Sequence, residues 1–337
     1  MGTITIGHRS FETPVLVPSV SSFETQLQPV DALRLQYTLR EPISLVSAYD
    51  IWLDREELVR ACRQFRRQGV LLLDSGGYES SRIGYYARDN QTKRWNFSRY
   101  AQIAGLNIYD FIFSYDYFRR SGESKSAFSK RIIREFRRHS DIIDIKRLIP
   151  VIHVRSADGK YPLTQREIVE LCGAVVTEIS CRFIAIPERE LGAGITGRAT
   201  LTREIVSEIK RHRQNCALHV LGCGNLLSFS LLAVAGAMMC DGLEWCRTFA
   251  ADNFHLHHFQ QKDVFADPGL YIGNPLAEFV IREVEHNYPT AVAVRNLLSF
   301  QSFTRHLHAR LGQRKVHEFV GENFGGTAGD AVRELEA

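Results

Sequence analysis

The segment LLLDSGGYES, residues 71–80, combines residue types that suit a ligand site. Asp74 ends an all-apolar run, and Gly76 and Gly77 allow a tight turn in which the backbone approaches a ligand closely. Tyr78 follows them, and its ring could lie flat against a planar ligand. Because Gly-Gly turns are common, it is the combination DSGGY that indicates a site.

A second segment, AVAGAMMCDGLEWCR at residues 233–247, also carries a carboxylate behind an apolar run. Asp241 lies near the end of that run, with Glu244 and Arg247 close behind it. The planar guanidinium of Arg247 could orient a carboxylate or bind a phosphate.

These side chains need a scaffold, and the sequence predicts one of alternating strands and helices. Apolar or β-branched runs predict buried strands at residues 15–20, 43–49, 70–74, 111–116, 148–154, 183–187, 218–222 and 237–243. Helical spacing with charged faces predicts helices at residues 54–67, 126–139, 165–179 and 202–213. Repeated β-then-α predicts a parallel sheet, and eight strands favour an α/β fold of the (β/α)8 TIM barrel type over a doubly wound open sheet, which remains the alternative.

Polar residues gather at or near the carboxyl ends of these predicted strands. They are Asp74, Asp116, His153, Glu188, residues 222–225 and Asp241. In a parallel barrel those ends share the face that carries the active site. An aspartate after a strand is also an ordinary turn or helix-capping residue, but several on one face weaken that structural reading.

The chain divides into a barrel core and a C-terminal appendage. We expect residues 1–249 to form the barrel, residues 250–325 to form an appendage with helices at 275–285 and 291–311, and residues 326–337 to be a flexible tail. The sequence contains neither an internal repeat of useful length nor a linker rich in Pro, Gly or Ser.

Composition predicts a soluble cytoplasmic protein. The 337 residues are 45% hydrophobic, and the net charge of +4 permits a nucleic-acid partner without requiring one. We expect no membrane partner, because no apolar stretch approaches the roughly 18 residues of a membrane span. Seven scattered cysteines, several within apolar runs, suit reduced and buried thiols.

At the two segments with Asp74 and Asp241 the sequence resembles the tRNA-guanine transglycosylase (queuine tRNA-ribosyltransferase) family, whose members carry a DSGG(F/Y)Q turn and a later DMFDCVxPTR segment. LLLDSGGYE and MMCDGLEWCR match both in register, including Arg247. Three further segments look like family segments in the same order: FSYDYF like FDEC, FIAIPERELG like AIGGLxVGE, and LHVLGCGN like YLMGVG. The resemblance spans roughly residues 15–247.

The resemblance implies a pentosyltransferase that exchanges a purine base on a nucleic acid. Asp241 would attack C1′ and form a covalent adduct, while Asp74 would protonate the departing guanine and deprotonate the incoming base. Asp116 would accept hydrogen bonds from the base, which Tyr78 and Leu221 would sandwich after it flips out of any stack. The other predicted base-binding residues are Ser75, Gly76, Gly77, His153, Glu188 and Gly222. The implied partners are DNA or tRNA and a guanine or 7-deazaguanine base, together with a homodimer or a partner protein; no cofactor is implied.

The sequence also departs from the family pattern. The family's tRNA-reading subdomain holds zinc through a C-x-C-x-x-C run, which does not follow Cys246. The nearest substitute is the cluster His255, His257 and His258, whose spacing lacks Cys or Asp partners, so we predict no metal. Losing that subdomain weakens the case for tRNA and leaves room for DNA, since the family has a DNA-acting branch that inserts a cyano-deazaguanine and relatives beside anti-phage defence genes.

The predicted base pocket is altered as well. His153-Val154-Arg155 stands where the family has QGG, and Pro187-Glu188 stands where it has GG. Pro187 has no backbone N–H to donate, and His153 is either a titrating group or a neutral wall residue. Glu188 could instead accept from the exocyclic amine of guanine.

Basic residues on the predicted helices suit solvated outer faces, whereas arginines near the predicted mouth are better phosphate candidates. These are Arg82, Arg155, Arg189 and Arg247. Three hypotheses stay open: an active transglycosylase on DNA or RNA, a binding or scaffold protein of a modification or anti-phage system that kept the barrel but lost turnover, and an enzyme acting on a free nucleoside.

Overall fold

The computed structural model describes residues 2–6, 9–23, 25–77, 95–155, 163–266 and 275–336. The predicted positions Tyr78 and Arg82 therefore lie outside the described residues.

Eight parallel strands curl into a barrel, which confirms the predicted fold class. The sheet order is β7-β6-β5-β4-β3-β10-β9-β8. The edge strands β7 and β8 meet through a parallel bridge between Val151 and Ala185, where Ile152 N–H donates to Ala185 C=O over 2.8 Å. The strands are β3 Val15–Val20, β4 Ile43–Ser47, β5 Val70–Asp74, β6 Phe111–Phe113, β7 Leu148–Ile149, β8 Phe183–Pro187, β9 Ala217–Leu221 and β10 Met239–Gly242.

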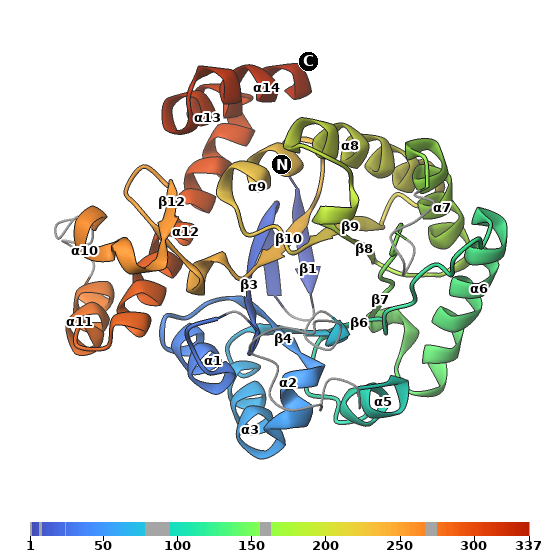
Figure 1. The fold of residues 1–337 in the computed structure, drawn as a ribbon, viewed down its shortest axis with the longest axis horizontal. Helices are drawn as coiled ribbons and strands as arrows, with labels where there is room; N and C mark the ends of the chain where they lie inside the picture. Colours follow the sequence, from blue (N-terminus) through green and yellow to red (C-terminus); the bar gives the residue numbers. More distant parts are fainter. Residues whose placement is uncertain are drawn as a thin grey trace.

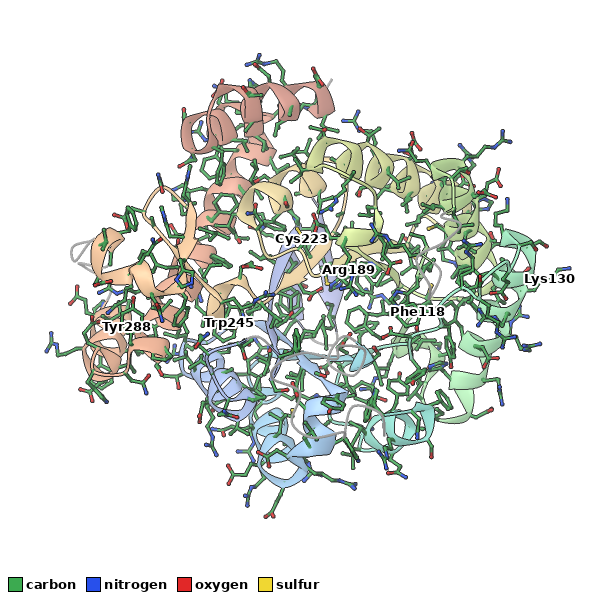
Figure 2. All side chains as sticks on the ribbon, viewed as in Figure 1. Phe118, Lys130, Arg189, Cys223, Trp245 and Tyr288 are labelled. Carbon is green, nitrogen blue, oxygen red and sulfur yellow. The ribbon has the colours of Figure 1, made fainter. Side chains whose placement is uncertain are left out.

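Helices surround this sheet as an outer ring (Figure 1). They are α1 Pro29–Thr38, α2 Ala48–Leu53, α3 Arg55–Phe65, α5 Phe97–Ala104, α6 Lys125–Arg138, α7 Gln165–Glu178, α8 Ile195–His212 and α9 Leu226–Val234. Short 3-10 turns occur at His139–Asp141, Ile145–Arg147, Glu188–Glu190, Glu244–Cys246 and Phe259–Gln261. Lys130 of α6 is exposed and points away from the barrel in Figure 2, as expected for a solvated outer face.

The predicted strands and helices are present, with two kinds of boundary difference. The strands expected at residues 111–116 and 148–154 end at Phe113 and Ile149, and Pro150, which cannot donate to a ladder, follows the second. Helix α8 begins at Ile195, ahead of the predicted residue 202, after a glycine with φ of 73°.

Apolar side chains fill the barrel and close its amino-terminal end. Inward residues such as Val17, Leu72 and Phe113 form one cluster, which a hairpin of β1 Thr3–Ile6 and β2 Arg9–Glu12 joins. The hairpin contributes Ile4, Ile6 and Phe11 to that cluster. The opposite end, where the strands finish, is therefore the end at which polar side chains gather.

The C-terminal region packs on one side of the barrel (Figure 1). It contains β11 Thr248–Ala250, β12 Leu256–His258, α10 Lys262–Phe265, α11 Pro275–Val284, α12 Tyr288–Gln313, α13 Val316–Phe324 and α14 Gly326–Glu336. In the part of the chain that the structure describes, no helix is both long enough and apolar enough to span a bilayer.

The expected flexible tail is instead the helix α14, which packs on α13, α8 and α9. Ala328, Val332 and Leu335 recur at helical spacing and pack against the core, and Val332 is fully buried. Glu336 accepts from the backbone N–H of Val316 at the start of α13 over 3.2 Å. The sequence did not indicate this helix, because the charges around its apolar stripe concealed the periodicity.

Candidate functional site

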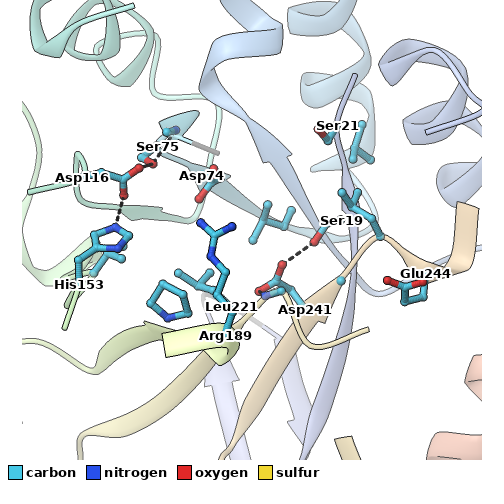
Figure 3. Close-up of a pocket in the computed structure, with 18 of the residues that line it drawn as sticks. Ser19, Ser21, Asp74, Ser75, Asp116, His153, Arg189, Leu221, Asp241 and Glu244 are labelled. Atoms are coloured by element: carbon cyan, nitrogen blue, oxygen red, sulfur yellow. Dashed lines mark hydrogen bonds and ion pairs between the residues drawn. The ribbon is translucent and has the colours of Figure 1, made fainter. Parts of the chain in front are cut away.

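A pocket of about 230 Å³ opens at the carboxyl ends of the barrel strands (Figure 3). Asp74, Asp116 and Asp241 all line it, so the structure brings together the three aspartates that the sequence singled out. Strand alternation explains this placement for Asp74, because Val70 and Leu72 of the same strand pack inside the barrel.

Three donors among the described residues surround the carboxylate of Asp241. Ser19 Oγ of β3 donates to its Oδ2 over 2.7 Å, and His219 Nε2 of β9 lies 2.8 Å from its Oδ1. The N–H of Gly222 donates to the same Oδ1 over 3.2 Å. Hydrogen bonds to a carboxylate stabilise its ionised form, so this arrangement suits a group that reacts as an anion.

These donors are themselves fixed by packing. The indole Nε1 of Trp245 donates to the carbonyl of Ser19 over 2.8 Å. His219 is fully buried, and its ring meets the ring of Phe113 edge-on at 5.0 Å. Because the imidazole is held in this apolar wall, Asp241 has a defined direction within the pocket.

Asp74 lies in a contrasting environment. Burial raises the pKa of Asp74 to about 7, and the negative charges of Asp116 and Asp241 contribute in the same direction. The N–H of Gly76 opposes this shift by donating to Asp74 Oδ2 over 3.0 Å. Asp74 is therefore a carboxyl group that can hold or release a proton near neutral pH.

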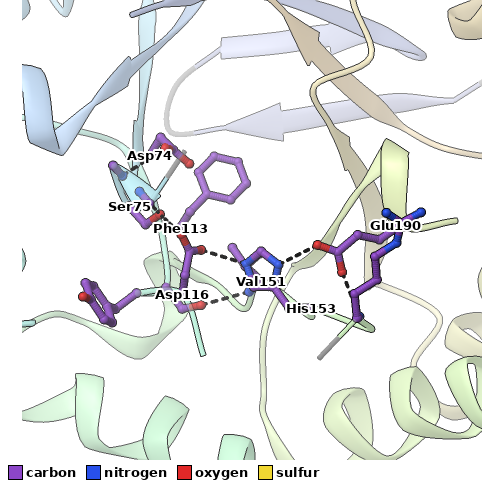
Figure 4. A network of polar contacts seen from close by, with 12 residues as sticks. Asp74, Ser75, Phe113, Asp116, Val151, His153 and Glu190 are labelled. Carbon is purple, nitrogen blue, oxygen red and sulfur yellow. Dashed lines mark hydrogen bonds and ion pairs between the residues drawn. The ribbon is translucent and has the colours of Figure 1, made fainter. Parts of the chain in front are cut away.

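Asp116 is the first member of a buried charged chain (Figure 4). His153 Nε2 lies 3.0 Å from Asp116 Oδ1, and His153 Nδ1 lies 2.9 Å from Glu190 Oε1. Burial lowers the pKa of His153, but the two carboxylates outweigh burial and raise that pKa to about 10. His153 is thus an imidazolium that donates in both directions, rather than a titrating group at neutral pH.

Glu190 anchors the far end of this chain. Its Oε2 accepts from the backbone N–H groups of Val154 and Arg155, over 2.7 and 3.1 Å. Burial favours a higher pKa for Glu190, yet the contacts with His153 and these two N–H groups together lower it. The wall behind Asp116 is accordingly a fixed arrangement of alternating charges.

The DSGG turn fits closely against Asp116. Ser75 Oγ donates to Asp116 Oδ2 over 3.0 Å and accepts from the N–H of Gly77 over 3.1 Å. A Cβ atom at Gly77 would lie 1.4 Å from Asp116 Oδ2, which only a glycine avoids. The second glycine of the motif is therefore explained by contact with Asp116.

Other predicted site residues are distributed around the pocket. His153, Leu221, Gly222, Arg189 and Arg247 line it. Glu188 and Arg155 are not among its lining residues. Glu188 is ion-paired with Arg198 over 2.6 Å, and the side chain of Arg155 is exposed while its N–H bonds Glu190. Their predicted contacts with base or phosphate stay predictions.

Sequence reasoning missed four side chains of the site. Ser19, His219 and Glu190 hold the charged groups, and Phe118, 36% exposed, contacts His153 with the two rings tilted and their centroids 4.3 Å apart. Alternation could have found two of them, because Ser19 lies two residues after inward Val17 and His219 two residues after inward Ala217. Glu190 follows its strand by three residues, where no periodic signal remains.

Among the described residues, no group of three or more His, Cys, Asp or Glu side chains is arranged to hold a metal ion. Each of the three clustered histidines of the appendage contacts a different residue. His255 stacks on Phe324, His257 stacks on Phe265, and His258 Nδ1 accepts from the N–H of Gln260.

Two comparisons with known proteins found nothing. No model of a known protein family matches the chain, and no curated protein matches it either. The functional argument therefore depends on the geometry of the pocket and on the motifs themselves.

Proposed function

We propose that this chain is a base-exchange transglycosylase that replaces guanine in a nucleic acid with a 7-deazaguanine, as its resemblance to tRNA-guanine transglycosylases implies. One observation carries the proposal: two carboxyl groups, Asp74 and Asp241, line the same pocket in opposite environments. Asp241 is surrounded by donors, while burial raises the pKa of Asp74 to about 7. An ionised and a protonated carboxyl are the pair that substitution at a glycosidic carbon requires.

In the first half-reaction, a carboxylate oxygen of Asp241 attacks C1′ of the target nucleotide. The C1′–N9 bond breaks with its electron pair leaving on the base, and Asp74 gives that base its proton. The product is a glycosyl ester of Asp241 and a free guanine. Ser19, His219 and Gly222 keep the attacking carboxylate directed into the pocket.

In the second half-reaction, the ionised Asp74 removes the N9 proton of the incoming base. N9 then attacks C1′, the ester bond breaks, and Asp241 is restored as a carboxylate. Two inversions at C1′ give net retention, as in retaining glycosidases. The N9 proton of the incoming base replaces the proton that Asp74 gave to the departing guanine, so the cycle closes without a cofactor.

The polymer must present its nucleotide to the mouth of the pocket. The target base has to leave any stack in order to reach Asp74 and Asp241. Arg247, which also lines the pocket, is suited to bind a phosphate of that nucleotide. Both DNA and RNA fit this description, and each is a substrate to test.

The experiment is incorporation of isotopically labelled guanine or 7-deazaguanine into DNA and tRNA pools, followed by mass spectrometry of the digested nucleosides. The proposal predicts incorporation into one of the pools and its loss in Asp241→Ala. Failure with both pools would contradict the proposal.

One observation favours a second candidate, a binding or scaffold protein without turnover. Asp116, the predicted acceptor of the base, already accepts from His153 and Ser75, so part of its hydrogen-bonding capacity is used within the wall. This candidate predicts that a deazaguanine binds while labelled base is never incorporated. The incorporation experiment separates the two.

A further inference from the structure

The pocket wall around Asp116 is rich in acceptors and poor in donors. The two N–H groups of His153 are directed at Asp116 and Glu190, and Ser75 Oγ donates to Asp116. Pro187 lines the same wall and has no N–H. A guanine-type base needs a donor as well as an acceptor, because its carbonyl oxygen O6 lies beside its N1–H and amino groups.

Arg189 is the donor-bearing side chain that enters this part of the pocket. It lines the cavity, and Figure 3 shows its guanidinium pointing into the space between Asp74 and Asp241. Arginine carries five N–H donors in a fixed fork, so it can satisfy a planar acceptor edge while keeping another contact.

The backbone that carries Arg189 is held on both sides. Arg189 is the middle residue of the 3-10 turn Glu188–Glu190 that follows β8. Glu188 is ion-paired with Arg198 over 2.6 Å, and Glu190 is bonded to His153 over 2.9 Å. The two glutamates thus fix a turn whose central side chain is directed to the ligand.

From this placement we propose that Arg189 recognises the carbonyl of the bound base by donating to O6, the acceptor that 6-oxopurines and their 7-deaza analogues share. This inference rests on the proposed function, which supplies the guanine-type base. Asp116 accepts from the opposite, amino-bearing part of the same edge. Arg189 is then a specificity residue, and the chain selects 6-oxopurines and their 7-deaza analogues.

The test is calorimetric binding of free guanine and of 2-aminopurine, which keeps the amino group but lacks both the carbonyl and the N1–H. The wild-type protein is expected to prefer guanine by at least roughly 10-fold, because both missing groups have partners in the pocket. Arg189→Ala is expected to weaken guanine binding by roughly 10- to 100-fold, the loss of one hydrogen bond from a charged donor, and to leave 2-aminopurine binding unchanged.

The control variant is Arg166→Ala, which removes an arginine with an 89% exposed side chain on α7 and should keep the preference. A preference for guanine that is undiminished in Arg189→Ala would overturn the inference, as would a wild-type protein without preference. Weaker binding of an oligonucleotide with unchanged base preference would assign Arg189 to a phosphate instead. A preference that persists while labelled base is never incorporated would contradict the proposed function alone.

Discussion

Neighbouring side chains give the two aspartates of the pocket different chemistry. Asp241 faces Ser19 and His219, whereas Asp74 is half-buried near two other carboxylates, and desolvation is the main reason for its raised pKa. The amino-acid type is the same in both positions, so the roles follow from the surroundings. Both the catalytic and the stability predictions for Asp74 follow from this contrast.

Asp74→Asn removes the proton donor while preserving shape. A general acid contributes about 10²- to 10⁴-fold to such a reaction, so we expect base exchange to fall by that factor. In the wild-type protein the acid form of Asp74 is depleted as pH rises through about 7, and the rate of the first half-reaction should decline there. A pH–rate profile of wild type and variant, measured under single turnover, checks the lower rate of the variant and the decline of the wild-type rate near pH 7. An unchanged rate in the variant would exclude Asp74 as the acid.

The same substitution should stabilise the fold at alkaline pH. The pKa of Asp74 is raised from 3.8 to about 7, so between these values the folded state keeps a proton that the unfolded state releases. The free energy of unfolding therefore falls as pH rises through this window, by up to about 4 kcal/mol. We expect Asp74→Asn to be more stable than wild type at pH 8 and equal to it at pH 3.5, as measured by urea unfolding. A less stable variant at pH 8 would contradict the assignment.

His153→Gln tests the charged wall. The pKa of His153 is raised from 6.5 to about 10, so its stabilising contribution is complete below pH 6.5 and is lost as pH rises through about 10. Breaking such a buried arrangement costs about 3–5 kcal/mol, which we expect at pH 6. The difference in the free energy of unfolding between His153→Gln and wild type should narrow toward pH 10. The control is His306→Gln, at an exposed position, where no such pH-dependent difference is expected. A difference independent of pH would mean that His153 is neutral in the folded protein.

Residue type and position predicted the three aspartates, because each lies at or near the carboxyl end of a predicted strand and carboxylates there face one mouth. The same reasoning singled out Glu188, which is ion-paired with Arg198, and overlooked Glu190, which is bonded to His153. A one-residue choice within a 3-10 turn depends on tertiary contacts that local sequence does not encode.

At the scale of elements, hydrophobic periodicity predicted where the barrel strands and several of the barrel helices lie in the sequence. Buried runs gave β3, β5 and β8 their bounds, since a strand covered on both faces is apolar throughout. The β1–β2 hairpin and α14 were not predicted. Their apolar residues are few and separated by charged ones, and their burial depends on partners distant in sequence.

A buried amide connects helix α12 to the segment that follows β10. Asn296 accepts from Ala250 N–H over 2.8 Å and donates to the carbonyls of Trp245 and Thr248, over 2.8 and 2.6 Å. Because Trp245 also holds Ser19, this contact connects α12 to the donors around Asp241.

Asn296→Leu leaves these three backbone groups without their partner. Each lost bond to a buried group costs about 1–3 kcal/mol, so we expect unfolding to become easier by about 3 kcal/mol or more. Urea unfolding followed by tryptophan fluorescence measures this loss. Gln313→Leu, at the exposed end of the same helix, should change stability little. Equal stability of the two variants would show that the hydrogen bonds of Asn296 do not stabilise the fold.

The whole molecule is a barrel closed at one end by a hairpin and supported on one side by the C-terminal helices. Because the β1–β2 hairpin closes the amino-terminal end, the pocket with the three aspartates opens at the opposite end of the barrel. The helices α13 and α14 extend this packed body, since Val332 is fully buried between them and the core.

Val332→Ala tests whether the last helix belongs to the folded unit. Removing two methyl groups from a filled site is expected to cost about 2 kcal/mol. Val264→Ala, at a position that is 71% exposed, is the matched control and should cost little. Thermal unfolding of both variants gives the comparison, and equal melting temperatures would support the flexible tail that the sequence alone suggested.

The central claim is that Asp241 forms a covalent bond to a nucleic acid, and trapping that bond tests it most directly. The protein is mixed with matched DNA and tRNA pools without incoming base, quenched in denaturant and analysed by mass spectrometry. The account predicts a denaturant-resistant adduct with one pool, attached at Asp241 and missing in Asp241→Ala. Absence of an adduct with both pools, or an adduct that persists in Asp241→Ala, would contradict it.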